Sequence, residues 1–180
     1  MRLSRSIVSA LLALAAATAP MRAISDPNQT GRPEVKGQPK VDHYIHSGLP
    51  FLFKGWGPIQ FRLLPGLQSI TTTEQPSEEG DGQIDYVHEF EFVDMKVWLW
   101  CAPKGSSRCL VEQVTVLGPS RNTRFGIRVG QTTTTLQSIL GTPHINRDGV
   151  WHYPASTTSA VYFFIEEDRI RFIVWSLYTG

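Results

Sequence analysis

The chain has 180 residues, a length that suits one compact domain or two small repeats. Of these residues, 41% are hydrophobic and 18% are charged. Its formal net charge of +1 includes three arginines within residues 1–23. Without these residues the chain has 14 basic and 16 acidic residues. That balance argues against a nucleic-acid-binding protein, which usually carries a basic stripe.

The first 23 residues have the layout of a secretory signal peptide. Arg2 and Arg5 precede an apolar run from Ile7 to Ala17, and small residues follow. The run is shorter than the ~20 apolar residues that span a bilayer. Several cleavage positions fit, the last of them after Ala23, and no cysteine follows the run that could take a lipid. We therefore expect a periplasmic or secreted protein with no transmembrane segment after cleavage.

Residues 24–42 are polar and rich in proline and glycine, which is typical of a flexible leader. The sequence places the start of the folded part near His43. From there we expect strands and turns, because the apolar runs 51–53 and 59–64 are short and bounded by glycine and proline.

Two cysteines, Cys101 and Cys109, are the only ones in the chain. In an oxidising compartment such a close pair predicts a disulfide. The stretch between them is rich in turn residues and apolar β-type segments flank it, so the bridge would join the two arms of one hairpin. A redox or metal pair is the alternative, although the spacing is not Cys-x-x-Cys.

Alternation of side chains predicts strands on both sides of residue 94. In 86–93 the aromatic residues share one face with His88, and carboxylates share the other. In 96–100, Trp98 and Trp100 share a face opposite Val97 and Leu99. One face must be core and the other a sheet surface, and the pattern leaves open which is which.

The sequence predicts one helix, within 132–140. A threonine can cap its start, Leu136, Ile139 and Leu140 form its apolar face, and Gly141 ends it. Strands at 150–153, 160–165 and 170–175 follow, the last two joined by a hairpin with a charged tip at 166–168.

Three sequence matches recur in the same order and suggest a duplication. Residues 61–63 resemble 127–129, the tetrapeptide Leu-Gln-Ser-Ile occurs at 67–70 and 136–139, and 92–97 resembles 164–170. We interpret 43–117 as a degenerate first helix-and-sheet unit and 118–180 as a second, with chance matching as the alternative.

The second unit resembles a known family. Gly126-Ile-Arg-Val-Gly-Gln-Thr132, Leu-Gly-Thr-Pro143 and Trp-His-Tyr153 are similar to the unit shared by the SmpA/OmlA envelope proteins and β-lactamase inhibitor protein (BLIP). The resemblance implies an α+β, BLIP-like fold, in which short helices pack on an antiparallel sheet in tandem copies. It also implies a binding role, as an inhibitor of a secreted hydrolase or as an envelope assembly partner. The chain lacks the lipid-bearing cysteine of SmpA-type members.

Catalytic and cofactor signatures are not evident, so we expect no enzyme, no cofactor and no metal. His43 and His46 are spaced like a ligand pair without a third ligand, and residues 79–86 resemble only the centre of a calcium-binding loop. The favoured function is an exported inhibitor or immunity-type protein that binds a hydrolase or toxin. An envelope scaffold factor and a small enzyme using histidine and carboxylates are the alternatives. The candidate partner-binding residues are Glu78, Glu79, Asp81, Trp98, Trp100, Trp151 and Tyr153.

Overall fold

A computed structural model describes residues 38–48, 52–77, 82–103, 108–121, 123–155 and 159–177, all within the compact unit Val35–Gly180. The helices are α2 (Gln38–His46), α3 (Pro58–Arg62), the 3-10 turn η2 (Arg124–Gly126) and α4 (Thr133–Leu140). The strands are β1 (Leu67–Pro76), β2 (Ile84–Phe92), β3 (Met95–Cys101), β4 (Cys109–Val116), β5 (Ile145–Arg147), β6 (Val150–Pro154), β7 (Ala160–Glu166) and β8 (Arg169–Ser176). None of these helices is long and apolar enough to cross a membrane.

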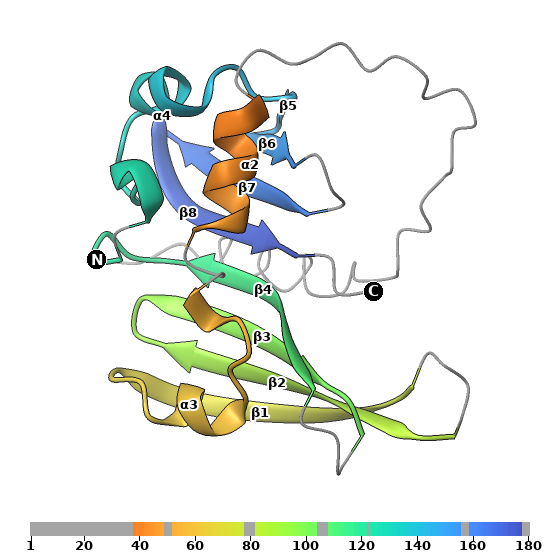
Figure 1. Cartoon of the computed structure of the whole chain (residues 1–180). Helices are drawn as coiled ribbons and strands as arrows, with labels where there is room; N and C mark the ends of the chain where they lie inside the picture. The colour runs from red at the N-terminus through yellow and green to blue at the C-terminus, as the bar shows by residue number, and fades with distance from the viewer. Residues whose placement is uncertain are drawn as a thin grey trace, which may run out of the picture. The chain divides into compact units, whose positions relative to one another are not determined.

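The strands form a single antiparallel sheet in the order β1-β2-β3-β4-β8-β7-β6-β5 (Figure 1). The first four strands are consecutive neighbours, the last four are consecutive neighbours, and β4 pairs with β8 between the two sets. Each set therefore forms a four-stranded meander, and a short helix precedes each one, α3 before β1 and α4 before β5. This arrangement confirms the α+β class with short helices and an antiparallel sheet.

One face of the sheet carries the core. A row of directly paired residues runs from β2 to β6 and every member is buried, namely Phe90, Val97, Val114, Trp175, Val161 and Tyr153. Such a row forms because alternate side chains of each strand point to the same face. The helices cover this same face: Phe61 of α3 stacks near Phe90, and Tyr44 of α2 packs on Trp175 with ring centroids 5.5 Å apart.

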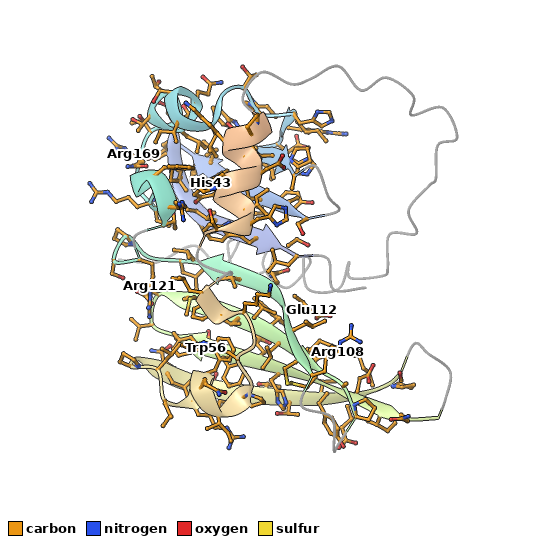
Figure 2. All side chains as sticks on the ribbon, viewed as in Figure 1. His43, Trp56, Arg108, Glu112, Arg121 and Arg169 are labelled. Carbon is orange, nitrogen blue, oxygen red and sulfur yellow. A yellow bond between two sulfur atoms is a disulfide. The ribbon has the colours of Figure 1, made fainter. Side chains whose placement is uncertain are left out.

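A cluster of aromatic side chains lies on this same face, around α3. Phe53 and Phe61 each pack edge to face on Trp56, which is labelled in Figure 2, and they are tilted relative to each other; the three centroid distances are 5.1 to 5.3 Å. Aromatic pairs in this geometry add stabilisation beyond the area they bury. The first meander therefore has its own cluster of aromatic side chains on the buried face.

The start of the folded part was predicted too late. Residues Gln38 to Asp42, expected to be leader, form the first half of α2. The apolar side chains of α2 are buried: Val41, Tyr44 and Ile45 are each 5% exposed or less. Packing on the sheet holds this helix despite the nearby proline and glycine, which is why composition alone did not reveal it.

The described part of the run 51–53, residues 52–53, and the run 59–64 are also not strands. Residues 52–53 form a 3-10 turn, and Pro58 begins α3, since proline suits the first turn of a helix. The amide of Gly57 donates to Gln60 Oε1 at 2.9 Å and so satisfies one unpaired group at the helix start.

Several predicted elements are confirmed. The disulfide joins Cys101 of β3 to Cys109 of β4, which are directly paired residues with Cα atoms 4.1 Å apart. The threonine-capped helix is α4, where Thr132 Oγ1 accepts from the Thr135 amide. The hairpin with a charged tip is the β7–β8 turn.

Candidate protein-binding face

The sheet face opposite α2, α3 and α4 is the candidate site, and we call it the open face. The strand registers place on it Glu89, Glu91, Lys96, Trp98, Trp100, Gln113 and Thr115 from β2 to β4, and His152, Tyr162, Phe164, Phe172 and Val174 from β6 to β8. Within the described part of the chain no helix lies on this face (Figure 1). Apart from Thr115, these residues are half-buried.

One row of the open face crosses the whole sheet. It runs through directly paired residues in the order Ser69, Glu91, Lys96, Thr115, Val174, Tyr162, His152 and Ile145. The row is polar and charged over the first meander and mostly apolar or aromatic over the second. The open face is therefore divided into a polar end and an aromatic end.

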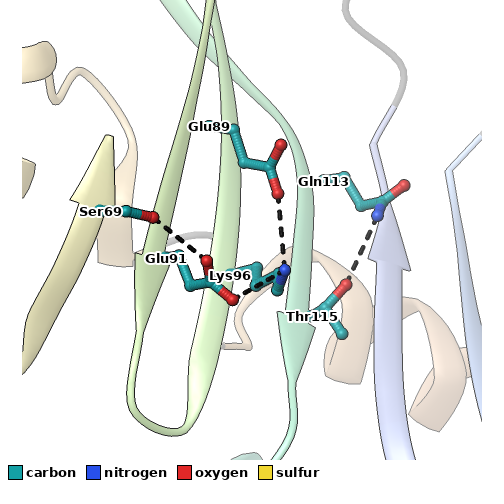
Figure 3. Close-up of polar contacts among 6 residues, drawn as sticks. All are labelled: Ser69, Glu89, Glu91, Lys96, Gln113 and Thr115. Atoms are coloured by element: carbon teal, nitrogen blue, oxygen red, sulfur yellow. Dashed lines mark hydrogen bonds and ion pairs between the residues drawn. The ribbon is translucent and has the colours of Figure 1, made fainter. Parts of the chain in front are cut away.

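The charges of the polar end are paired with each other. The Lys96 ammonium lies 2.9 Å from Glu91 Oε1 and 3.7 Å from Glu89 Oε1, and Ser69 donates to Glu91 Oε2 at 3.1 Å (Figure 3). The hydrogen bond from Lys96 lowers the pKa of Glu91, and the bond to Glu91 raises the pKa of Lys96. Both groups stay ionised at neutral pH and hold each other in place, so neither is suited to exchange protons.

The predicted tryptophans lie beside this ion cluster. Trp98 stands between Glu89 and Gln113, its direct neighbours on β2 and β4. Trp100 is fixed more firmly, since its indole Nε1 donates to Asp85 Oδ2 at 3.1 Å. Both rings are thus half-exposed aromatic surfaces on a rigid scaffold, a combination that is frequent at the centres of protein interfaces.

The Trp100 ring has a second neighbour. The Arg108 guanidinium carbon lies 5.8 Å from the ring centroid, within the range of a cation–π contact (Figure 2). Asp85 is only 2% exposed, and its Oδ1 has no hydrogen-bond partner in the described structure. Removal of the Trp100 indole would leave both Asp85 oxygens unpaired, so Trp98 is the cleaner residue for testing the face.

Stacked rings make up the aromatic end. Phe164 lies parallel to Phe172 with centroids 4.0 Å apart, and His152 lies parallel to Tyr162 with centroids 4.8 Å apart. Burial and then the nearby His144 lower the pKa of His152, and burial raises the pKa of Tyr162. Both rings are therefore uncharged at neutral pH, and this end offers an uncharged aromatic surface.

The predicted partner-binding residues do not all lie together. Trp98 and Trp100 share the open face, whereas Trp151 and Tyr153 belong to the opposite, helix-covered face and are 8% and 2% exposed. These two residues fill the core, so they are not available to a partner in this fold. The remaining acidic candidates, Glu78, Glu79 and Asp81, lie outside the described residues.

Sequence reasoning missed the aromatic end. Tyr162, Phe164 and Phe172 occupy alternate positions of predicted strands, and that period of two was the available signal. The pattern was ambiguous because the neighbouring residues that point to the other face, Phe163 and Ile173, are equally apolar. Only the position of the helices shows which set is core.

No cluster of three or more potential metal ligands occurs among the described residues. His43 bonds with Ser47 through Nδ1, at 3.2 Å, and its ring packs near Phe125. These contacts place the His43 side chain between the last turn of α2 and η2.

The comparisons with known proteins give no relative, because no protein-family model, no curated protein and no solved structure matches the chain.

Proposed function

We propose that the chain is an exported protein-binding module that docks its open face on a secreted or periplasmic hydrolase or toxin and so inhibits or neutralises it. The observation that carries this proposal is the set of half-exposed aromatic side chains on a rigid sheet, with Trp98 and Trp100 at one end and Tyr162, Phe164 and Phe172 at the other. Aromatic residues supply most of the binding energy in many interfaces, and rings already fixed in place lose little entropy on binding.

The order of the strands is compatible with the tandem units that the resemblance to the SmpA/OmlA proteins and BLIP implies. Two meanders that meet at their last strands, each preceded by a short helix, are what two tandem helix-and-sheet units would give. We therefore propose the tandem duplication on the basis of topology. An envelope assembly or scaffold role would use the same face and the same resemblance.

A second candidate, a small exported enzyme, is favoured by one observation. Thr72 Oγ1 lies 2.8 Å from His88 Nδ1, and burial followed by the charge of Arg62 lowers the pKa of His88. A neutral imidazole beside a hydroxyl is half of a nucleophile–base arrangement. If this pair is catalytic, His88→Ala will abolish the function while the protein stays folded, and Trp98→Ala will not.

The binding proposal is tested with two matched alanine variants. The immobilised chain is incubated with secreted and periplasmic fractions, and the captured protein is purified, titrated calorimetrically against the chain and assayed for its own activity. We expect a saturable 1:1 complex that lowers the partner's activity. Trp98→Ala should weaken it about 30-fold, which corresponds to about 2 kcal/mol for an interface hot spot.

Leu63→Ala is the control. Leu63 is 80% exposed and directly follows α3, a helix that covers the other face of the sheet, so its truncation should leave the affinity unchanged. Equal losses in the two variants, or the failure to find any stoichiometric complex, would contradict the proposal.

A further inference from the structure

The two edges of the sheet are very different. The β5 edge has three residues, one of them Arg147, and short charged edges resist pairing with another chain. The β1 edge has ten residues, and its centre, from Ile70 to Gln75, contains no lysine, arginine or proline. A long and mostly uncharged edge strand is a ready template for one more strand.

The ladder with β2 shows which backbone groups of β1 point away from the sheet. The Ser77 amide donates to Gln83 O at 2.9 Å in the same register that pairs Gln75 with Asp85. In an antiparallel ladder, hydrogen-bonded pairs alternate with non-bonded ones. The odd-numbered residues 71, 73 and 75 therefore bond to β2, and the even-numbered residues 70, 72 and 74 direct their N–H and C=O groups outward.

The position of Pro76 agrees with this assignment. It is also even-numbered, so its nitrogen, which lacks a hydrogen, faces away from β2. The proline thus costs the β1–β2 ladder nothing, and it limits any outer pairing to the residues before it.

We propose that β1 pairs with β1 of a second copy of this chain, antiparallel and centred on Thr72, to form a two-fold symmetric dimer. In this register Thr72 lies opposite the Thr72 of the second copy, and Ile70 lies opposite Glu74. All three outward-facing residues of each strand then meet outward-facing residues, which gives about six new backbone hydrogen bonds.

The side chains of β1 also fit this register. Thr71 lies opposite Thr73 twice, and cross-strand threonine pairs are favourable. Glu74, the only charged residue of β1, lies opposite Ile70 and not opposite its own copy, so no like charges meet. A self-complementary strand is what a two-fold interface requires.

The same register determines which faces of the two sheets lie on the same side of the dimer. Residues of equal parity pair, so side chains on one face of the first sheet continue on the same face of the second. The dimer would carry both open faces on one side, which makes it bivalent for a partner that is itself repeated.

The test uses the residue at the two-fold axis. Sedimentation velocity of the purified chain across a range of concentrations should show a monomer–dimer equilibrium. Thr72→Lys alone and Thr72→Glu alone each place like charges opposite each other, and each should weaken the dimer at least about tenfold. An equimolar mixture of the two variants places Lys opposite Glu and should restore dimers.

Two further measurements separate this interface from others. Thr134→Lys, on the exposed side of α4, makes the same charge change elsewhere and should leave the dimer intact. Hydrogen exchange should show the amides of residues 70, 72 and 74 protected only at dimer-forming concentrations, whereas those of 71, 73 and 75 are protected always. A chain that stays monomeric, a dimer that both Thr72 variants leave intact, or a mixture that fails to restore it would overturn the proposal.

Discussion

A buried hydrogen bond between α2 and the segment before η2 gives a direct test of how the first helix is held. The Tyr44 hydroxyl is fully buried and lies 2.8 Å from Thr123 Oγ1. The Thr123 hydroxyl donates its one proton to Ile127 O, at 2.6 Å. Tyr44 is therefore the donor in its bond with Thr123, and the two partners are not equivalent.

This asymmetry predicts unequal mutational costs. Tyr44→Phe removes only the donor and leaves the bond from Thr123 to Ile127, so the free energy of unfolding should fall by about 1 kcal/mol. Thr123→Val keeps the shape but leaves the Tyr44 hydroxyl buried without an acceptor, and the fall should be about 2–3 kcal/mol. In the double variant that orphan hydroxyl is absent, so its loss should be at least about 1 kcal/mol smaller than the sum of the single losses.

Urea unfolding followed by tryptophan fluorescence measures these differences, provided that the slope of the transition stays constant. Thr134→Val, on the exposed side of α4, is the matched control and should change stability by less than about 0.5 kcal/mol. Equal costs for the two single variants, or additive costs in the double variant, would refute the assignment of donor and acceptor.

Three other predictions concern stability. Burial raises the pKa of Tyr44, so the protonated side chain stabilises the fold fully below the unfolded pKa of about 10. Above that pH the free energy of unfolding should fall by up to about 1.4 kcal/mol per pH unit, and Tyr44→Phe should flatten this decline in a pH series of urea melts. Replacing Cys101 and Cys109 with alanine opens a short loop and should cost about 2.5 kcal/mol in the same assay, and a loss below about 0.5 kcal/mol would show that the bridge constrains little. Glu167 has a positive φ of 50° in the β7–β8 turn, so Glu167→Asn should raise the unfolding free energy by about 0.5–1 kcal/mol, and a decrease would mean that the Glu167–Arg171 pair matters more than the turn.

The parts of the fold that were predictable carry their signals locally. The capped start and glycine end of α4, the Cys101–Cys109 disulfide and the charged β7–β8 tip each depend on residues a few positions apart. The helix α2 has no such local signal. It is held by the contacts of Tyr44 with Trp175 and Thr123, which lie 131 and 79 positions away.

The candidate site was half predictable for a related reason. Alternation put Trp98 and Trp100 on one face of β3, but either face of an isolated strand can become core. Docking of α3 through Phe61 onto Phe90 makes the face of Val97 and Leu99 the buried one and leaves the tryptophans on the other. The same reasoning explains why Trp151 and Tyr153, equally aromatic, became core residues.

The tetrapeptide Leu-Gln-Ser-Ile occurs twice and adopts two conformations, which bears on the proposed duplication. At 136–139 it lies in α4, where Thr132 caps the start and Gly141 ends the helix. At 67–70 it opens β1, because Gly66 turns the chain with a φ of 84° and β-branched threonines follow, which favour a strand. The identical residues therefore do not mark equivalent positions. If the two meanders derive from one unit, α3 must align with α4, and β1 then corresponds to β5. The tetrapeptide match would instead align β1 with α4, so it is not evidence for the duplication.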